Sequence, residues 1–245
     1  MGVQMGELVR GRSEGRASGL HRRLRRVTLG ALAAAAIAAS HQSLAADEGW
    51  MLRKEAGGIR VYTREQPNSK FEAVRAEMIL DDVRLASLVA LIDDPSACAL
   101  LESRCAEAYT LDRPSDSEHL IYRHNAMPFP IKDRDVVLHF SWRQNPDTLV
   151  VDLESRHVEG VLPVDPRRVR LPSVAVGWRF VPLADGRVEA SSEGHIEPGE
   201  NLPAWLLNTL LVDAPFKTME AVAEVVRQPR YRDAELGFIR DAATD

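Results

Sequence analysis

Apolar and polar residues alternate along the segment 135–143, where every second residue from Val136 to Trp142 is apolar. Successive side chains of a β-strand point to opposite faces, so the pattern predicts a strand with one apolar and one mostly polar face. The segments 168–183 and 187–197 repeat the alternation, and the Asp-Gly between them is typical of a β-hairpin. Further strands are predicted at 59–63, 71–80, 107–112, 119–125 and 149–156.

Helical spacing of apolar residues marks other parts of the chain. A helix is predicted after Asp81-Asp82, which we expect to cap it, because apolar residues recur at Leu85, Leu88, Val89 and Ile92. One long helix is predicted at 203–227, with a kink near Pro215, and a short helix at 47–54. These elements predict an α+β domain in which the final helix covers a curved antiparallel sheet.

The first 45 residues differ from the rest of the chain. Arginines at 22–26 precede an uncharged segment at 27–39, and small residues follow at Ser43 and Ala45. This order is typical of an export signal cleaved near Ala45, by the general or the twin-arginine route, although an Ala-rich surface helix or an uncleaved anchor is an alternative. We therefore predict a periplasmic protein with an export signal at 1–45, a folded domain at 46–230 and a C-terminal tail at 231–245.

The distribution of charge along the chain limits the classes of partner that it can bind. The net charge is −5, and residues 1–45 hold seven of the 31 Lys and Arg but two of the 36 Asp and Glu, so the remainder carries −10. Non-specific binding to nucleic acid needs a basic surface. The acidic charge of the remainder therefore excludes nucleic acid as a partner. The sequence has no motif of a nucleotide site, zinc protease or serine hydrolase, and we expect no cofactor, no metal and no catalytic residue.

Export would place Cys98 and Cys105 in an oxidising compartment, where two such thiols tend to pair. In one continuous helix their Cα atoms would be about 10.5 Å apart, whereas a disulfide requires about 4.4–6.8 Å. Pro95 and the strand expected after Cys105 favour a turn between the two cysteines. We predict a disulfide, with two unpaired thiols or half of a zinc site as the alternatives.

Three motifs occur in the order known from one family. They are PFPIKDRD at 128–135, GWRFVPL at 177–183 and PGENLPAWLLN at 198–208. The first resembles the P-W-P-x-x-x-R-D element of START domains, the steroidogenic-acute-regulatory-related lipid-transfer family. The other two resemble its W-x-x-x-P strand end and its entry into the C-terminal helix. Glu200 departs from the pattern at a position where a second glycine is usual, and the resemblance covers about residues 48–228.

The resemblance implies a helix-grip fold, in which a curved antiparallel sheet grips the long C-terminal helix and one lipid lies in a tunnel between them. The gate in this family is the final helix with an omega loop, which falls at 157–168 here. The apolar tip of that loop, VLPV at 161–164, precedes Arg167 and Arg168, which suits transient contact with an anionic membrane. We expect a monomer that binds and transfers a lipid or other hydrophobic molecule.

The inward strand faces and the resemblance together select the expected ligand contacts. These are Leu138, Phe140, Trp142, Leu162, Val176, Trp178, Trp205, Leu206 and Leu210. Arg134 and Asp135 are expected to form a structural ion pair that closes the sheet. Sterol-binding members often carry an arginine where Phe140 stands, facing an acid that Glu107 would match. A sterol is therefore in doubt, and a fatty acid, a phospholipid or a hopanoid-like ligand stays open.

An enzyme is the competing hypothesis, because related helix-grip proteins include aromatase/cyclases and hydrolases that use the same cavity. The inward faces of the predicted strands are almost wholly apolar, and Ser192 is the chief polar exception. A third hypothesis is an interaction domain with a filled core and no ligand.

Overall fold

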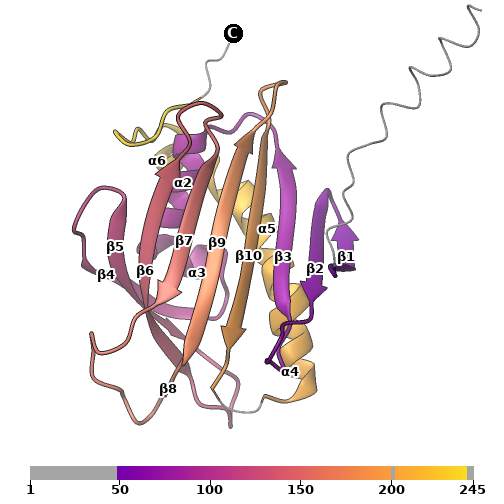
Figure 1. The fold of residues 1–245 in the computed structure, drawn as a ribbon, viewed down its shortest axis with the longest axis vertical. Coiled ribbons are helices and arrows are strands. Elements are labelled where there is room, and N and C mark those ends of the chain that lie inside the picture. The colour runs from indigo at the N-terminus through magenta and orange to yellow at the C-terminus, as the bar shows by residue number, and fades with distance from the viewer. Residues whose placement is uncertain (1–48, 200–201, 242–245) are drawn as a thin grey trace, which may run out of the picture. The chain divides into compact units, whose positions relative to one another are not determined.

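A computed structural model of the protein describes residues 49–199 and 202–241, and the predicted export signal lies outside them (Figure 1). Within the described ranges ten strands form one sheet, in which β8 pairs in parallel with β6 and the other pairs are antiparallel. The strands are β1 (Met51–Ala56), β2 (Ile59–Arg64), β3 (Ala73–Leu80), β4 (Cys105–Asp112), β5 (Glu118–Asn125), β6 (Arg134–Gln144), β7 (Val151–His157), β8 (Val169–Arg170), β9 (Ser173–Pro182) and β10 (Val188–Glu197).

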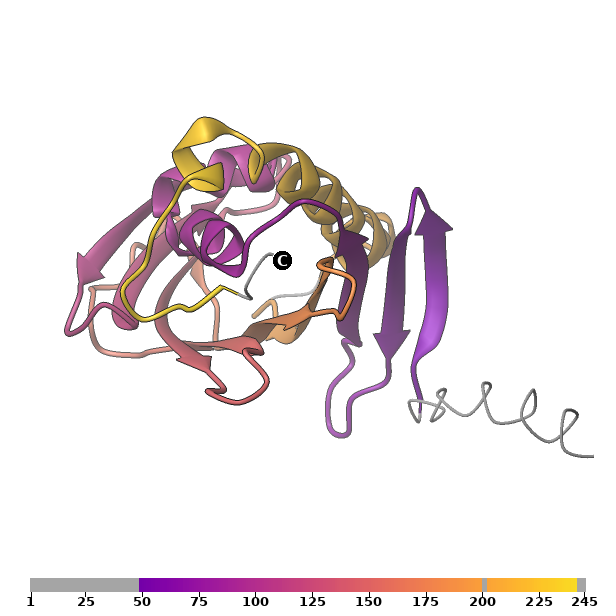
Figure 2. The same cartoon turned by 90° about the horizontal axis from the view of Figure 1, so that it is seen from above.

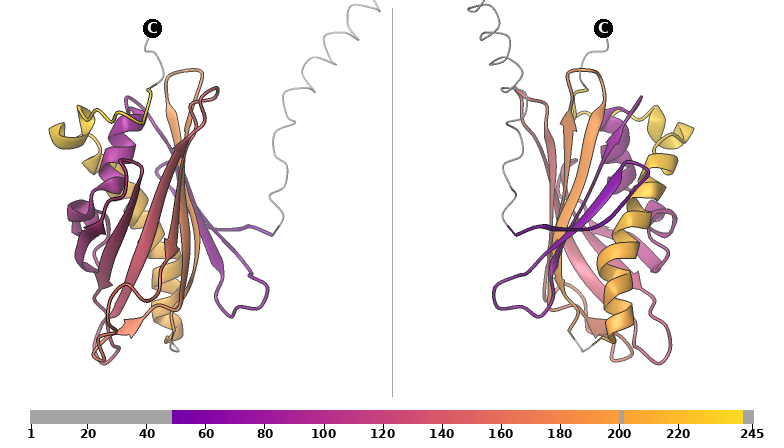
Figure 3. Two further views of the ribbon diagram at one scale, coloured as in Figure 1. Left: turned by 60° about the vertical axis from the view of Figure 1, so that its left-hand side comes forward. Right: turned by 90° about the vertical axis from the view of Figure 1, so that its right-hand side faces the viewer.

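The strand order in the sheet is β1-β2-β3-β10-β9-β7-β6-β5-β4. The last strand, β10, therefore lies between β3 and β9 and joins the N-terminal strands to the rest of the sheet. The helices are α2 (Leu85–Asp93), η2 (Pro95–Ala97), α3 (Cys98–Leu101), α4 (Ala204–Asn208), η3 (Thr209–Asp213), α5 (Ala214–Val225) and α6 (Pro229–Arg232). They lie on one face of the sheet (Figure 3).

The C-terminal helix covers the concave side of the curved sheet (Figure 2). Its second half, α5, buries Phe216, Met219, Val222 and Val225, which recur at the spacing of one helix face. Close to the position of the predicted kink, the helix contains one π-helical turn, η3, in which the N–H of Ala214 donates to the carbonyl of Thr209. The structure thus confirms the α+β helix-grip fold. Among the described residues, no helix is both long and apolar enough to cross a lipid bilayer.

The structure corrects the predicted helix at 47–54, because Met51–Ala56 is strand β1. Gly57 and Gly58 adopt φ values of 57° and 79°, which turn the chain into a hairpin with β2. The Trp50 ring lies between the guanidinium groups of Arg64 and Arg75, each 4.4 Å from the ring centroid. These contacts hold the segment against the sheet as an extended chain.

The C-terminal segment, predicted to be a tail, packs on the domain. Tyr231 and Ile239 are buried in the main core. The backbone N–H of Ala86, at the start of α2, donates to the Asp241 carboxylate at 3.0 Å. Arg84 is the N-cap residue of α2, so the expected cap by Asp81-Asp82 is wrong. A carboxylate 155 residues away in sequence takes that role, which helical spacing alone does not reveal.

The predicted disulfide is confirmed. Cys98 begins α3, Cys105 begins β4, and their Cα atoms are 5.8 Å apart. The chain turns between them, since the N–H of Cys105 donates to the carbonyl of Glu102 at 2.9 Å. The disulfide therefore closes a short irregular segment beside the C-terminal helix.

Reduction of this disulfide should lower the free energy of unfolding by about 2–3 kcal/mol, because the closed loop is short. Urea unfolding with and without dithiothreitol measures the difference. The double variant Cys98→Ser/Cys105→Ser is the control, and dithiothreitol should leave its midpoint unchanged. Two titratable thiols in the native protein would contradict the prediction.

Candidate functional site: a cavity beneath the C-terminal helix

A cavity of about 490 Å³ lies between the concave face of the sheet and the C-terminal helix. Most of its lining is apolar and comes from β3 (Val74, Ala76), β6 (Val136, Leu138, Phe140), β9 (Val174, Val176, Trp178) and the final helix (Leu207, Leu210, Leu211, Ala214, Met219). The volume is in the range of small-molecule sites. The space under the helix is thus partly hollow.

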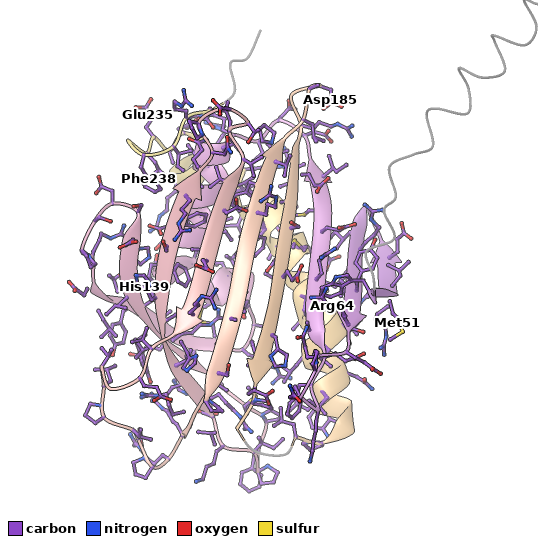
Figure 4. All side chains as sticks on the ribbon, in the orientation of Figure 1. Met51, Arg64, His139, Asp185, Glu235 and Phe238 are labelled. Atoms are coloured by element: carbon purple, nitrogen blue, oxygen red, sulfur yellow. A yellow bond between two sulfur atoms is a disulfide. The ribbon has the colours of Figure 1, made fainter. Side chains whose placement is uncertain are left out.

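Strand alternation directs the lining side chains of the sheet inward. His139 lies between two lining residues, Leu138 and Phe140, and points to the outer face (Figure 4). Gly194 of β10 is part of the wall, and a Cβ there would come within 2.6 Å of Cγ2 of Val176. Close approach of two strands therefore requires a glycine at this position.

Near Trp142, the space under the helix is filled by packed side chains. Trp142 is 3% exposed and stacks on Phe180, with ring centroids 6.3 Å apart. Its Nε1 donates to Oδ1 of Asp93 at 2.7 Å, and Nε2 of buried His119 lies 3.2 Å from the same oxygen. Burial lowers the pKa of His119, which favours the neutral imidazole. Trp142 consequently belongs to the packed core and not to the cavity wall.

The structure places five of the nine predicted contact residues in the wall, namely Leu138, Phe140, Val176, Trp178 and Leu210. The other four, Trp142, Leu162, Trp205 and Leu206, lie outside the described lining. In the final helix the lining includes Leu207, Leu210 and Leu211, whereas Leu206 is fully buried outside it. Trp205 is 55% exposed.

Sequence reasoning missed the polar part of the lining. Arg123, Asn125 and Arg134 come from β5 and β6, and the whole segment 99–104 between the two cysteines also lines the cavity. Alternation could have identified Arg134, because it stands two residues before Val136 on the same strand face. The segment 99–104 has no periodic signal, and only its disulfide marks it in the sequence.

The predicted ion pair of Arg134 with Asp135 is corrected, because the salt bridge of Asp135 forms with Arg170. Nε of Arg170 lies 2.8 Å from Oδ1 of Asp135, whose side chain is 2% exposed. Hydrogen bonding to Asp135 raises the pKa of the Arg170 guanidinium. Arg134 instead lines the cavity, and its Nη1 donates to the carbonyl of Lys132. Adjacent strand residues face opposite sides, which explains the difference.

The Asp135–Arg170 pair also holds the predicted omega loop, 157–168. Arg170 donates to the carbonyls of Leu162 and Pro163 at 3.4 and 3.3 Å. Tyr122 donates to Asp135 at 3.3 Å and accepts from Arg168, and burial together with Asp135 raises the pKa of Tyr122. The buried Asp135 carboxylate therefore fixes the end of the loop at two residues, at Arg170 directly and at Arg168 through Tyr122.

The β5–β6 and β7–β8 loops lie at one end of the sheet (Figure 1), and both carry exposed apolar side chains. Phe129 is 97% exposed, Val164 is 62% exposed and Val161 is 38% exposed. Nζ of Lys132 donates to the carbonyl of Pro166 at 3.4 Å, which joins the two loops. We refer to Phe129, Val161 and Val164 as the apolar tip.

The curved sheet that grips one long helix over a largely apolar cavity defines the helix-grip class of fold. Residues 32–228 match the START domain family model. An uncharacterized protein of Pseudomonas aeruginosa is 30% identical over 196 residues, which cover 78% of this chain and 92% of that protein. The chain therefore belongs to the START domain family.

Solved structures show the same fold. A STAR-related lipid transfer protein of Xanthomonas axonopodis has a TM-score of 0.67 and 31% identity, and the match covers 74% of this chain and 100% of that chain. Human StAR-related lipid transfer protein 5 has a TM-score of 0.66 and 15% identity, with 83% of this chain and 98% of that chain covered. The second similarity concerns the fold alone.

The replacement Arg170→Met should lower the free energy of unfolding by about 3–5 kcal/mol, because it leaves the Asp135 carboxylate buried without its salt bridge. The control is Arg179→Met, which breaks an exposed pair with Asp152 and should cost about 1 kcal/mol or less. Urea unfolding of both variants measures the two costs, and equal costs would contradict the structural role of Asp135–Arg170.

Proposed function

We propose that the protein binds one lipid, or another hydrophobic molecule, in the cavity and carries it as a soluble monomeric complex. The largely apolar cavity beneath the C-terminal helix is the observation that carries this proposal. Each methylene group removed from water stabilises the complex by about 0.8 kcal/mol. A lipid acyl chain has enough methylene groups for this binding free energy to keep it in the cavity while the complex moves through water.

The cavity wall also bears on the class of ligand. Phe140 lines the cavity at the position where sterol-binding relatives often carry an arginine, and Glu107 lies exposed on β4. The arginine–acid pair associated with sterol binding is therefore not formed at these two positions, and Phe140 makes the wall apolar there. This supports fatty acids, phospholipids or hopanoid-like molecules over sterols as ligands.

We infer that the protein works without catalysing a reaction on its ligand. The two residues considered for acid–base work do not share a site, since Ser192 lines the cavity and Glu107 lies exposed on β4. Turnover of a bound lipid that is lost in Ser192→Ala, with lipid binding retained, would instead favour an enzyme.

We propose further that the apolar tip touches membranes during transfer. Phe129 stands on a loop fixed by Asp133, whose carboxylate accepts from the N–H of Met127 and contacts Nε2 of His124, both at 2.8 Å. The bond from Met127, more than the one from His124, lowers the pKa of Asp133, which keeps the carboxylate charged. A firmly held loop can present its apolar side chain at low entropic cost.

We also propose that the protein is exported to the periplasm. Its supports are the order of basic, apolar and small residues in 1–45 and the Cys98–Cys105 disulfide, which is typical of oxidising compartments. Mass determination of the mature protein from its native host would locate the cleavage, which we expect near Ala45.

Purified protein from its native host should carry one extractable lipid. Organic extraction and mass spectrometry of native-host preparations test this directly, with protein denatured and washed before refolding as the ligand-free control. Repeated preparations without lipid would contradict the proposal.

The variant Phe140→Arg should weaken binding of a neutral apolar probe at least about tenfold, because it places a charge in the apolar wall. Fluorescence titration with N-phenyl-1-naphthylamine measures the affinity. His139→Arg is the matched control, since His139 is the adjacent residue and faces outward (Figure 4). Equal affinities of the two variants would show that the wrong face of β6 has been assigned to the ligand.

The variant Phe129→Ala should reduce partition onto vesicles of phosphatidylglycerol and phosphatidylcholine about tenfold, because a buried Phe side chain contributes about 1.5–3 kcal/mol. Co-sedimentation measures the bound fraction. Leu52→Ala, which removes a 50% exposed side chain on β1, is the control and should leave partition unchanged. An equal loss in both variants would contradict a role for the apolar tip.

A further inference from the structure

One end of the cavity is polar, and three side chains of the sheet build it. Asn125 pairs with Arg134 across β5 and β6, and Arg123 precedes Asn125 by two residues, so all three share the inward face. Nε of Arg123 donates to Oδ1 of Asn125 at 3.2 Å. Arg134 is 2% exposed. Two guanidinium groups and one amide thus meet at this end of the cavity wall.

The segment closed by the disulfide completes the same end. The N–H of Ala126 donates to the carbonyl of Arg104 at 2.8 Å, and Arg123 forms a salt bridge with Glu102. Both Ser103 and Arg104 line the cavity. The disulfide therefore fixes Arg104 close to Arg123 and Asn125.

Positive charge predominates in the described lining. Arg104, Arg123, Arg134 and Lys217 are basic, whereas Glu102 is the acidic residue among the described lining residues. Glu102 is engaged by Arg123, and in the described part of the chain no carboxylate forms a salt bridge with Arg104. Guanidinium groups bind carboxylates and phosphates through charge-assisted hydrogen bonds, which are strong where water is excluded.

We propose that the ligand is a lipid with an anionic head group, held at the end formed by Arg104, Arg123, Asn125 and Arg134 while its hydrocarbon part fills the apolar part of the cavity. This rests on the proposed function, binding of a hydrophobic ligand in this cavity. The shared head-group chemistry is an oxyanion, which is the carboxylate of a free fatty acid or the phosphate of a lysophospholipid.

Displacement of the neutral probe N-phenyl-1-naphthylamine from the full chain tests the proposal at pH 8. Hexadecanoic acid should displace the probe at a concentration about ten- to a hundredfold lower than hexadecan-1-ol, which has the same chain and no charge. Palmitoyl lysophosphatidic acid tests the phosphate source, and whichever anion displaces the probe better identifies the head group.

Arg104→Gln and Arg134→Gln should each remove most of the preference for the acid over the alcohol. Arg179→Gln, on the outer face, should keep the full preference, and thermal unfolding identifies a variant that fails to fold. Arg104 lies on an irregular segment, so its variant keeps the test open if Arg134→Gln unfolds.

The outcomes separate the two proposals. Equal displacement by acid and alcohol, or an unchanged preference in folded Arg104→Gln, would overturn the anionic head group. Failure of the probe and of every lipid to bind would overturn the proposed function itself.

Discussion

The packing of the C-terminal helix on the concave face of the sheet is the contact on which the cavity depends. Phe216, Met219, Val222 and Val225 of α5 are buried, each contributing about 1.5–3 kcal/mol relative to exposure. They anchor one half of the helix to the solid core around Trp142. The other half, α4 with η3, covers the cavity and includes Leu206 as its fully buried side chain among the described residues. The helix is thus held firmly at one end and weakly over the hollow part.

The π-helical turn divides these two halves. Pro215, two residues beyond its end, lacks the N–H that a regular α-helix would use at that position. Leu207 and Leu211 line the cavity before and within the turn, and Ala214 and Met219 of α5 continue the lining beyond it. Met219 is also part of the main core, so the anchored half of the helix contributes both to the core and to the cavity wall.

Strand alternation predicted the architecture well, because each strand has one face toward the core and one toward water. It located Leu138, Phe140, Val176 and Trp178 on the cavity wall. It could not tell hollow from filled space, and so Trp142, on the same strand face as Phe140, was expected in the wall although Asp93 and Phe180 fix it in the core. Strand alternation predicts the face of the sheet toward which a side chain points, whereas the packing of that side chain depends on residues distant in sequence.

The contributions from irregular segments were beyond the reach of periodicity. Asp241 caps α2 from the far end of the chain, and the segment 99–104 lines the cavity without any repeat of apolar residues. The sequence did indicate the disulfide, through the number and spacing of the two cysteines. It could not indicate that the bridged segment forms a wall, because that follows from its hydrogen bond to Ala126 on the neighbouring strand end.

The Arg-Asp dipeptide at 134–135 shows how one sequence motif serves two faces of a sheet. Since successive residues of a strand point apart, Arg134 enters the cavity while Asp135 meets Arg170 on the other side. Asp135 fixes the omega loop through Arg170, and the loop carries part of the apolar tip. The position of the cavity's cation and the position of the exposed loop are therefore set by the same two residues of β6. Any shift in the register of β6 would move both, which couples the cavity to the proposed membrane-facing end.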